Sequence, residues 1–321
     1  MSAALDLTVA IPVHNDRDPL LALLGELRCA TRIVVVDDGS EQPLQQGDLC
    51  AAAGLPPERL TLLRHDSALG AGAARNAALA QVQTDYLLYL DADDLPTREL
   101  PLLLADLEGQ DFDFCIFRHH DSRSEQENYW GPDPHDRALW RAAGSDIGAL
   151  TPVGPAAAAQ LVQTANYPWN KIYRTGFLRD HGIRCSRIPV HEDIELHWRS
   201  FLNARRILAS DRIAAIHFVT PGGNRLTNAL GPDRLRVFEP LTAIADEIST
   251  TGVDPLPFAR FTVGLLGWIH DHLHPELRPG FADRAQAFLN APANPALRSA
   301  IDDTRPGLRA DIAALLQADP P

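Results

Sequence analysis

The sequence has little cysteine, almost no lysine, no long apolar stretch and no excess of positive charge. Its 321 residues carry 42 acidic and 29 basic side chains, a formal net charge of −13. A surface this acidic repels phosphate backbones, so we expect no nucleic acid among the partners. The four cysteines are scattered without the spacing of metal ligands or redox pairs, which predicts reduced thiols.

Signals for membranes and secretion are also missing from the sequence. No run of about 18 apolar residues is present, so we expect no transmembrane segment. Residues 1–7 lack the basic and apolar regions of a signal peptide. These absences predict a cytoplasmic location, with peripheral contact at the inner face of the cell membrane as an alternative.

The near absence of lysine draws attention to Lys171, the only one in the chain. A general drift toward arginine is typical of coding bias, so Lys171 is either a chance survivor or present for chemistry, and both interpretations stay open. Lysine is a compact and flexible donor, unlike arginine. Lys171 is therefore a candidate for contact with a phosphate or an acceptor.

Short apolar runs alternate with helical patterns in the first part of the chain. Buried strands are predicted at 7–13, 32–36, 60–63, 86–90 and 112–117. This order favours an α/β fold with a mainly parallel sheet and helices on both faces. Ligands bind at the carboxyl ends of strands in such sheets, where the acidic loops beginning at Asp37 and Asp91 fall.

The second part of the chain has a different pattern. Residues 122–155 are polar and rich in glycine and proline, which predicts a long excursion over the active face, as in functional lids. An amphipathic helix is expected at 192–204 and two short strands at 207–218. From 229 onward the pattern is helical, with apolar stripes that we expect to pack on the preceding domain or to form a homodimer.

The central chemical signal is Asp91-Ala92-Asp93-Asp94 at a predicted strand end. Carboxylates this close repel each other unless a cation lies between them, and Mg²⁺ or Mn²⁺ binds through one or two carboxylates and substrate phosphates. The alternative is a solvated acidic turn that caps the next helix.

Further polar groups are ambiguous when taken singly. Residues 70–76, Gly-Ala-Gly-Ala-Ala-Arg-Asn, are similar to a dinucleotide fingerprint, but Arg75 replaces its third glycine. Glu192 and Asp193 could cap a helix or supply a general base. His217 is either structural or able to reach a metal, and Arg225 in the glycine loop that follows could bind a phosphate.

The order of these motifs resembles the family 2 glycosyltransferases of the GT-A fold, of the bacterial polysaccharide and glycoconjugate type. The resemblance rests on a series of motifs in a fixed order: Ile-Pro-Val-His-Asn at 11–15, Val-Val-Asp-Asp-Gly-Ser at 35–40, Gly-Ala-Ala-Arg-Asn at 72–76, Asp-Ala-Asp-Asp at 91–94, Trp-Asn-Lys-Ile-Tyr-Arg at 169–174, Glu192-Asp193 and His217. It covers roughly residues 5–228, so we expect a glycosyltransferase domain at 1–228 and a helical region at 229–321. His14 departs from the aromatic residue usual at its position.

The resemblance implies a role for each motif in an inverting sugar transfer from a nucleotide-diphosphate donor, UDP-linked by expectation, to a glycan, glycolipid or glycoprotein acceptor. The base would be Asp193, with Glu192 as competitor. Mn²⁺ or Mg²⁺ would be held by Asp93, Asp91 and His217. The donor nucleotide would contact Pro12, Val13, Asn15, Asp38, Arg75, Asp91 and Ala92, while Lys171, Trp169 and Arg225 are candidates for diphosphate or acceptor contact.

Two alternatives remain at this point. A sugar-phosphate nucleotidyltransferase can use a related sheet, but it would need a glycine-rich basic loop directly after the first strand, where residues 12–16 contain no glycine. A non-catalytic protein that binds nucleotide sugars or glycans is the other, and intact acids at Asp91, Asp93 and Asp193 argue against it.

Overall fold

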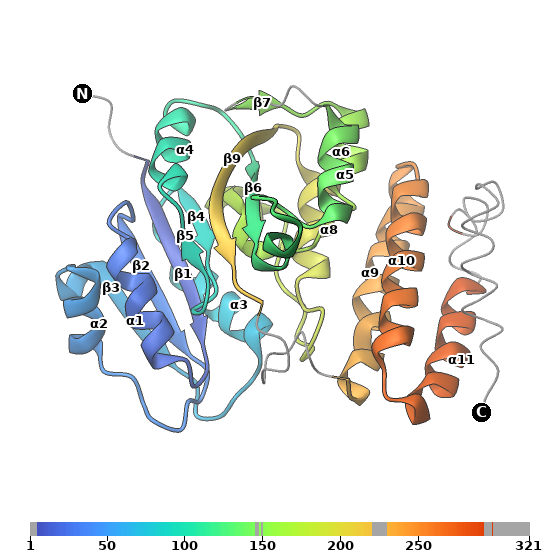
Figure 1. Ribbon diagram of the computed structural model, residues 1–321, viewed down its shortest axis with the longest axis horizontal. Helices are drawn as coiled ribbons and strands as arrows, with labels where there is room; N and C mark the ends of the chain where they lie inside the picture. Colours follow the sequence, from blue (N-terminus) through green and yellow to red (C-terminus); the bar gives the residue numbers. More distant parts are fainter. Residues whose placement is uncertain (1–4, 145–147, 149, 220–229, 292–296, 298–321) are drawn as a thin grey trace.

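The computed structural model describes residues 5–144, 148, 150–219, 230–291 and 297 (Figure 1). The strands are β1 (Leu7–Val13), β2 (Arg32–Asp37), β3 (Leu60–Arg64), β4 (Tyr86–Tyr89), β5 (Leu95–Pro96), β6 (Phe114–Asp121), β7 (Thr151–Pro152), β8 (Lys171–Arg174) and β9 (Ile207–His217). The helices flanking them are α1 (Arg17–Glu26), α2 (Gln46–Ala53), α3 (Ala71–Gln81), α4 (Glu99–Leu107), α5 (Pro134–Ala143), α6 (Pro155–Leu161), α7 (Thr175–Asp180) and α8 (Ile194–Asn203). The helices α9 (Phe238–Thr251), α10 (Leu256–His272) and α11 (Arg278–Leu289) follow.

The strands form one sheet in the order β3-β2-β1-β4-β8-β6-β9-β5, with β7 beside β9. Pairing among β1 to β4 is parallel, because helices connect these strands. The segment that became β8 enters antiparallel between β4 and β6. The α/β class is confirmed, but the sheet is mixed: the expected parallel pairing holds among β1 to β4 and between β6 and β9, and the other pairs are antiparallel.

Alternating side chains of the first strands explain why helices cover both faces. In β1, Val9 and Ile11 join the core beneath α1, α2 and α4, whereas Ala10 joins the core beneath α3 and α7. In β2, Val35 and Val34 divide in the same way. Strands buried on both sides read as continuous apolar runs, which is why the sequence predicted them well.

The stretch expected as two short strands is the single strand β9, which curves along the sheet (Figure 1). Its pairing with β6 shifts register on both sides of Arg118, and this irregularity lies opposite the polar stretch at 210–212. A bulge of this kind bends a strand without ending it. In the sequence, the polar residues at this bend therefore resembled a loop between two separate strands.

The stretch at 122–155 is not the lid that the sequence predicted. It contains the short 3-10 helix η2 (Ser122–Glu127), then α5 and β7, and α5 buries Trp140 in the core. None of its described residues lines the pocket discussed below.

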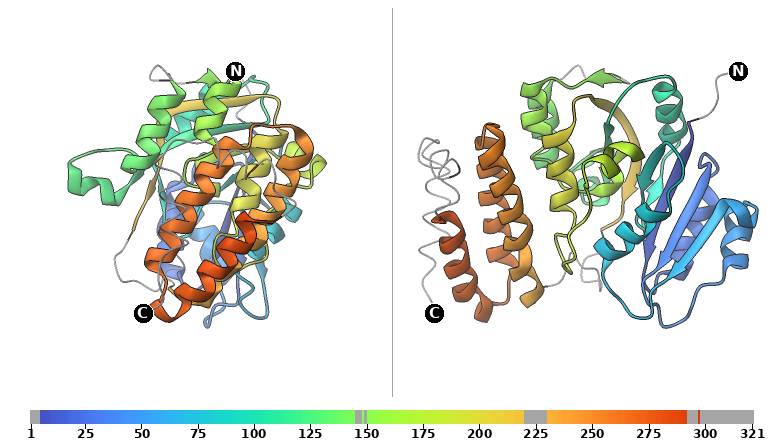
Figure 2. Two further views of the ribbon diagram at one scale, coloured as in Figure 1. Left: turned by 90° about the vertical axis from the view of Figure 1, so that its right-hand side faces the viewer. Right: turned by 180° about the vertical axis from the view of Figure 1, so that it is seen from behind.

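The helices α9, α10 and α11 lie together beside α8 (Figure 2). Ile194 and Trp198 of α8 share a core with Leu241, Phe258 and Leu266 of α9 and α10. This is one of the two arrangements that the apolar stripes predicted; the homodimer stays a prediction. The boundary expected at 228 falls outside the described residues.

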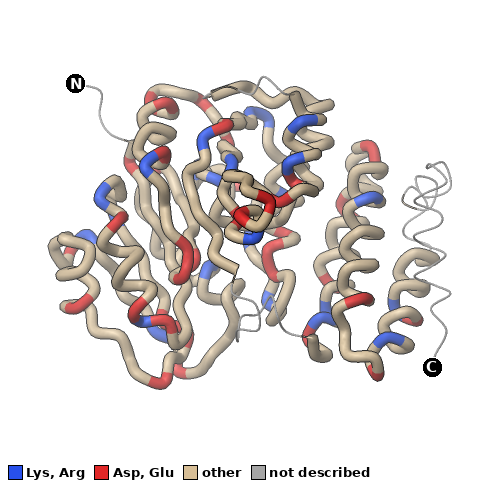
Figure 3. Tube along the Cα trace, in the orientation of Figure 1, with Lys and Arg blue, Asp and Glu red and all other residues tan. Residues whose placement is uncertain are grey.

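Charge along the C-terminal helices is mixed, with acidic and basic positions interspersed (Figure 3). Within the part of the chain that the structure describes, no helix combines the length and the apolar character needed to cross a membrane.

Candidate functional site

A pocket of about 560 Å³ opens at the carboxyl ends of β1 and β4, beside the first turns of α3 and α8. This is the edge where the sequence placed the site. The predicted residues that line it are Pro12, Val13, Asp38, Arg75, Asp91, Ala92, Asp93, Trp169, Glu192, Asp193 and His217. Segments that lie far apart in the sequence therefore meet in one cavity.

Asp38 belongs to the pocket wall, but its carboxylate is engaged by the protein. It accepts hydrogen bonds from the backbone N–H groups of Leu69 (2.9 Å) and Gly70 (2.8 Å), and it contacts His65 Nδ1 at 2.6 Å. These bonds hold the loop before α3 against the end of β2. Asp38 thus shapes this end of the pocket, and its contact with a nucleotide base stays a prediction.

Two predicted residues, Asn15 and Lys171, do not line the pocket. Asn15 has a left-handed backbone (φ 59°), and its side-chain oxygen accepts from the backbone N–H of Glu41 at 2.8 Å, so it braces the loop after β1. Lys171 is completely buried, and its Nζ donates to the carbonyl of Tyr167 (2.7 Å) and to Oδ1 of Asn170 (2.6 Å). Arg225 lies outside the described residues.

Arg75 connects the two acidic motifs of the site. Its guanidinium donates to Glu192 Oε1 at 2.7 Å and to Asp91 Oδ1 at 2.6 Å, and the side chain is almost entirely buried. Burial alone would lower the pKa of Arg75, but these two carboxylates outweigh it and raise the pKa. Since Glu192 and Asp91 are both engaged by this cation, neither is a free acid facing the cavity.

Gly72 at the start of α3 lets the Glu192 segment approach. A Cβ added at Gly72 would lie 2.3 Å from the carbonyl oxygen of Ser186 and 2.9 Å from Cβ of Glu192. The backbone N–H of Ser186 in turn donates to the carbonyl of Glu192 at 2.7 Å. The glycine that resembled part of a phosphate loop is therefore required by packing between α3 and the residues before α8.

Asp193 stands at the N-terminal boundary of α8 without capping the helix through its side chain. Burial, together with the neighbouring Glu192, raises the pKa of Asp193 to about 7, while Arg75 and Lys171 act in the opposite direction. Burial lowers the pKa of Lys171 to about 7, and Asp193 opposes this fall. A carboxylate that titrates near neutrality, in a pocket, is suited to accept a proton from a substrate.

His217 is oriented by Asp94, which sits at the end of the acidic motif. Its Nδ1 lies 3.0 and 3.1 Å from the two oxygens of Asp94, and the backbone N–H of Phe218 donates to the same carboxylate at 3.1 Å. Burial opposes protonation of His217, but the bond to Asp94 outweighs it and its pKa is raised. A histidine whose other nitrogen faces a carboxylate is the arrangement common among metal ligands.

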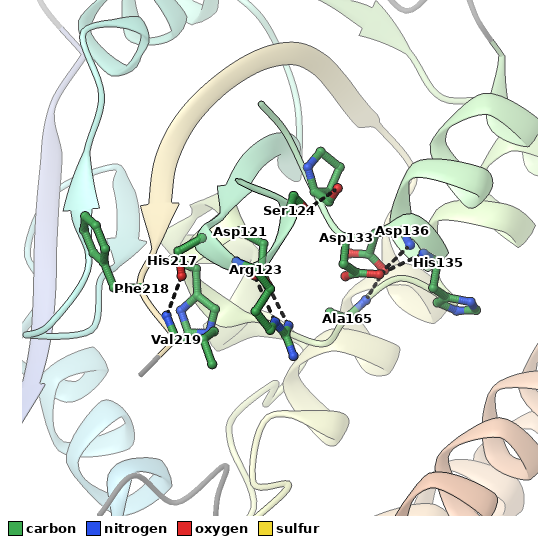
Figure 4. Close-up of polar contacts among 12 residues, drawn as sticks. Asp121, Arg123, Ser124, Asp133, His135, Asp136, Ala165, His217, Phe218 and Val219 are labelled. Carbon is green, nitrogen blue, oxygen red and sulfur yellow. Dashed lines mark hydrogen bonds and ion pairs between the residues drawn. The ribbon is translucent and has the colours of Figure 1, made fainter. Parts of the chain in front are cut away.

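The acid next to His217 on the neighbouring strand is already neutralised. Asp121 of β6 pairs in register with His217, and Arg123 folds back onto it (Figure 4). The Arg123 guanidinium donates to both oxygens of Asp121 at 2.9 and 2.6 Å. Burial would raise the pKa of Asp121, but these bonds lower it overall.

The donor set fits a divalent cation only in part. Among the described residues, no three His, Cys, Asp or Glu side chains form a cluster able to hold a metal, and Asp91 is paired with Arg75. Asp93 and His217 still face the same cavity. Mg²⁺ and Mn²⁺ commonly use one or two protein ligands and complete their shell with substrate phosphates and water, which this arrangement allows.

Several lining residues were missed by sequence reasoning. Tyr167 stacks on Trp169 with ring centroids 4.5 Å apart, and together they form one wall. Arg234, from the 3-10 helix η5 (Pro232–Val237), and Trp268, from α10, reach the pocket from the C-terminal region. Stacking aromatics next to the recognised Trp-Asn-Lys segment could have suggested Tyr167, whereas no motif marks Arg234 or Trp268.

Known proteins similar to this chain carry glycosyltransferase names. A pre-mycofactocin glycosyltransferase of Mycobacterium tuberculosis is 40% identical over 201 residues, which are 60% of this chain and 38% of that protein. The glycosyltransferase GlyG of Streptococcus pneumoniae is 22% identical over 129 residues, or 39% of this chain and 42% of that protein. The chain thus spans about two fifths of the length of the curated relatives it matches.

Solved structures share the fold over nearly the whole chain. Residues 1–349 of TarS from S. aureus, in complex with UDP-GlcNAc, superpose with a TM-score of 0.75 at 20% identity, covering 97% of this chain and 89% of that one. The family model described as glycosyl transferase family 2 matches residues 8–163. Residues 8–163 therefore match glycosyl transferase family 2, as the motifs predicted, and the chain has the fold of TarS.

Proposed function

We propose that this protein is an inverting glycosyltransferase that moves a sugar from a nucleotide-diphosphate donor to an acceptor hydroxyl. The observation that carries the proposal is the placement of Asp193 in the same pocket as Asp93 and His217. A base and a set of hard, metal-compatible ligands in one cavity are what a metal-assisted single displacement requires.

The donor is taken to be a UDP-linked sugar. TarS, which has the same fold, was solved with UDP-GlcNAc. Pro12, Val13 and the Asp38 loop provide the end of the pocket for the nucleotide. The acceptor is a hydroxyl of a glycan, glycolipid or glycoprotein, and it enters at the end of the pocket that holds Asp193 and the aromatic wall.

The transfer follows from the charges of the site. Asp193 accepts the proton of the acceptor hydroxyl, whose oxygen bonds to the anomeric carbon as the bond to the diphosphate breaks. Asp93 and His217 would hold a Mn²⁺ or Mg²⁺ ion, which supplies charge stabilisation for the departing diphosphate when it is bound. Arg75 pairs with Asp91 and Glu192, which reduces the repulsion between these carboxylates and the phosphates.

Thermal unfolding tests the donor and the metal together. With Mn²⁺ present, UDP or a UDP-sugar at 100 times its Kd should add about 2.7 kcal/mol to the free energy of unfolding and raise Tm. The substitution Asp93→Asn should remove the metal-dependent part of this shift and abolish turnover, measured as UDP release. Asp18→Asn is the matched control, because its side chain is 91% exposed.

Two outcomes would overturn the proposal. Full turnover of Asp93→Asn, or of the wild type in excess chelator, would show that the metal is not needed at this site. Metal-dependent UDP binding without hydrolysis or transfer, across a panel of UDP-sugars and acceptors, would favour a protein that binds nucleotide sugars without catalysis.

A further inference from the structure

The C-terminal region contributes a contact to the segment that carries the proposed base. Arg234 Nη1 lies 3.1 Å from Nε2 of His191, the residue directly before Glu192 and Asp193. Both side chains line the pocket, and Arg234 is 1% exposed. The contact joins residues separated by 43 positions, so it links two parts of the fold that the sequence treats as separate regions.

His191 has a backbone conformation that needs support. Its φ is +66°, in the left-handed region, where the Cβ of a residue other than glycine is crowded. Such conformations persist only when the surroundings hold them, and they cluster at functional sites. The turn at His191 also decides how Glu192 and Asp193 are presented, because their directions follow from the backbone that precedes them.

Arg234 is itself held in place. Its guanidinium lies 4.6 Å from the ring of Trp268 in α10, and that indole stacks on His272 at 4.5 Å. An arginine that is desolvated over an aromatic ring is a strong and directional contact. Because arginine only donates hydrogen bonds, Nε2 of His191 is the acceptor, and burial together with Arg234 keeps the ring neutral by lowering the pKa of His191 to about 3.

We propose that Arg234 is a positioning residue for catalysis: its contact with His191 holds the left-handed turn that aims Asp193 into the pocket. The inference rests on the proposed function for its effect on turnover. It makes the C-terminal helices a part of the catalytic apparatus, with Trp268 as the support for Arg234.

The first test compares Arg234→Met with Arg236→Met. Arg236 lies in the same 3-10 helix but is 43% exposed and pairs with Glu239, so its loss should leave turnover unchanged. Arg234→Met should lower kcat on the order of 10- to 100-fold, the range expected when a reacting group is misplaced, while KM for the donor and Kd for UDP stay within about twofold. Equal loss of donor binding and kcat would contradict a positioning role.

The second test asks whether the effect passes through His191. Glycine adopts a positive φ without crowding, so the turn in His191→Gly no longer depends on Arg234. Adding Arg234→Met to that background should then cost less than about threefold in kcat, whatever His191→Gly costs alone. A full additional loss in the double variant would show that Arg234 acts independently of the turn and would overturn the inference.

Thermal unfolding of the same four proteins separates this inference from the proposed function. The effects of Arg234→Met and His191→Gly on Tm should be non-additive even without any substrate. If the wild type shows no transfer but this coupling is present, the proposed function fails and the contact stands. If the effects of the two substitutions on Tm are additive, Arg234 and His191 are not coupled. The inference then fails whatever the activity.

Discussion

At the scale of single residues, the two adjacent acids before α8 have different surroundings. Glu192 is engaged by Arg75 at 2.7 Å, whereas Asp193 is not paired with that guanidinium and has a pKa raised to about 7. Both acids precede the first residue of α8 and line the pocket, so their contacts, and not helix geometry, distinguish them. The structure thus supplies a physical reason to prefer Asp193 as the base, which the family resemblance had only implied.

A pH profile of turnover tests this preference. A base must be deprotonated to act, so a folded-state pKa raised to about 7 means that Asp193 is protonated and inactive at lower pH. We expect kcat to fall about tenfold per pH unit below that pKa and to level off above it. Asp193→Asn should lower kcat by about 10²- to 10⁴-fold and remove this dependence, with Kd for UDP nearly unchanged.

Glu192→Gln is the matched comparison for Asp193→Asn. Glu192→Gln should weaken the interaction with Arg75, but kcat should still fall at low pH as it does in the wild type. The assignment is wrong by one residue if Glu192→Gln loses this pH dependence while Asp193→Asn keeps near-normal turnover. Loss of UDP binding in Asp193→Asn would instead place the residue on the donor side.

Lys171 is buried behind the pocket and does not line it. Its isolation in an arginine-rich chain suggested a chemical role at a phosphate, but its ammonium is completely buried. There it holds the carbonyl of Tyr167 and the side chain of Asn170, next to the aromatic wall of the pocket. Arginine is not an equivalent replacement there, because its planar guanidinium has a different donor geometry from the compact ammonium of lysine.

At the scale of elements, the sequence predicted the strands whose residue types follow directly from their burial. The runs that became β1, β2 and β4 are apolar because both faces of the sheet are covered, and the acids after β4 follow from the chemistry of the site. The pairing of β8 between β4 and β6 was missed, because a four-residue strand in a motif-rich segment has no periodic signal. Contacts such as Arg75 with Glu192, 117 positions apart, leave no local trace in the sequence.

The packing interface between α8 and α10, called the seam here, gives a prediction about stability. Trp198 is 2% exposed and meets the rings of Phe258 and Phe261 at 5.0 and 5.1 Å. Trp198→Ala should cost about 3–5 kcal/mol of stability, because it leaves a cavity that the surrounding helices fill only in part. The measurement is the urea midpoint of unfolding. Trp130→Ala, at a side chain 54% exposed, should cost less than about 1 kcal/mol, and equal losses would contradict the seam.

At the scale of the whole molecule, we expect the family domain and the helical region to depend on each other, because they share a core and a pocket. The family model ends at residue 163, yet the core that contains Val162, Ile194 and Trp198 is completed by α9, α10 and α11. The pocket is also completed from that side, by Arg234 and Trp268. A region without any recognisable motif therefore contributes both to the core and to the site.

Splitting the chain tests this dependence. Residues 1–229 expressed alone would expose the apolar face of α8 around Ile194 and Trp198, so we expect insoluble protein or large aggregates in size-exclusion chromatography. Co-expression with residues 230–321 as a separate chain should bury that face again, give a complex that purifies together, and restore UDP release from a UDP-sugar. The same co-expression with Trp198→Ala in the first piece should weaken the complex, since the seam loses its largest side chain. A soluble, monomeric and fully active 1–229 would contradict the dependence, because the core and the pocket would then be complete without the C-terminal helices.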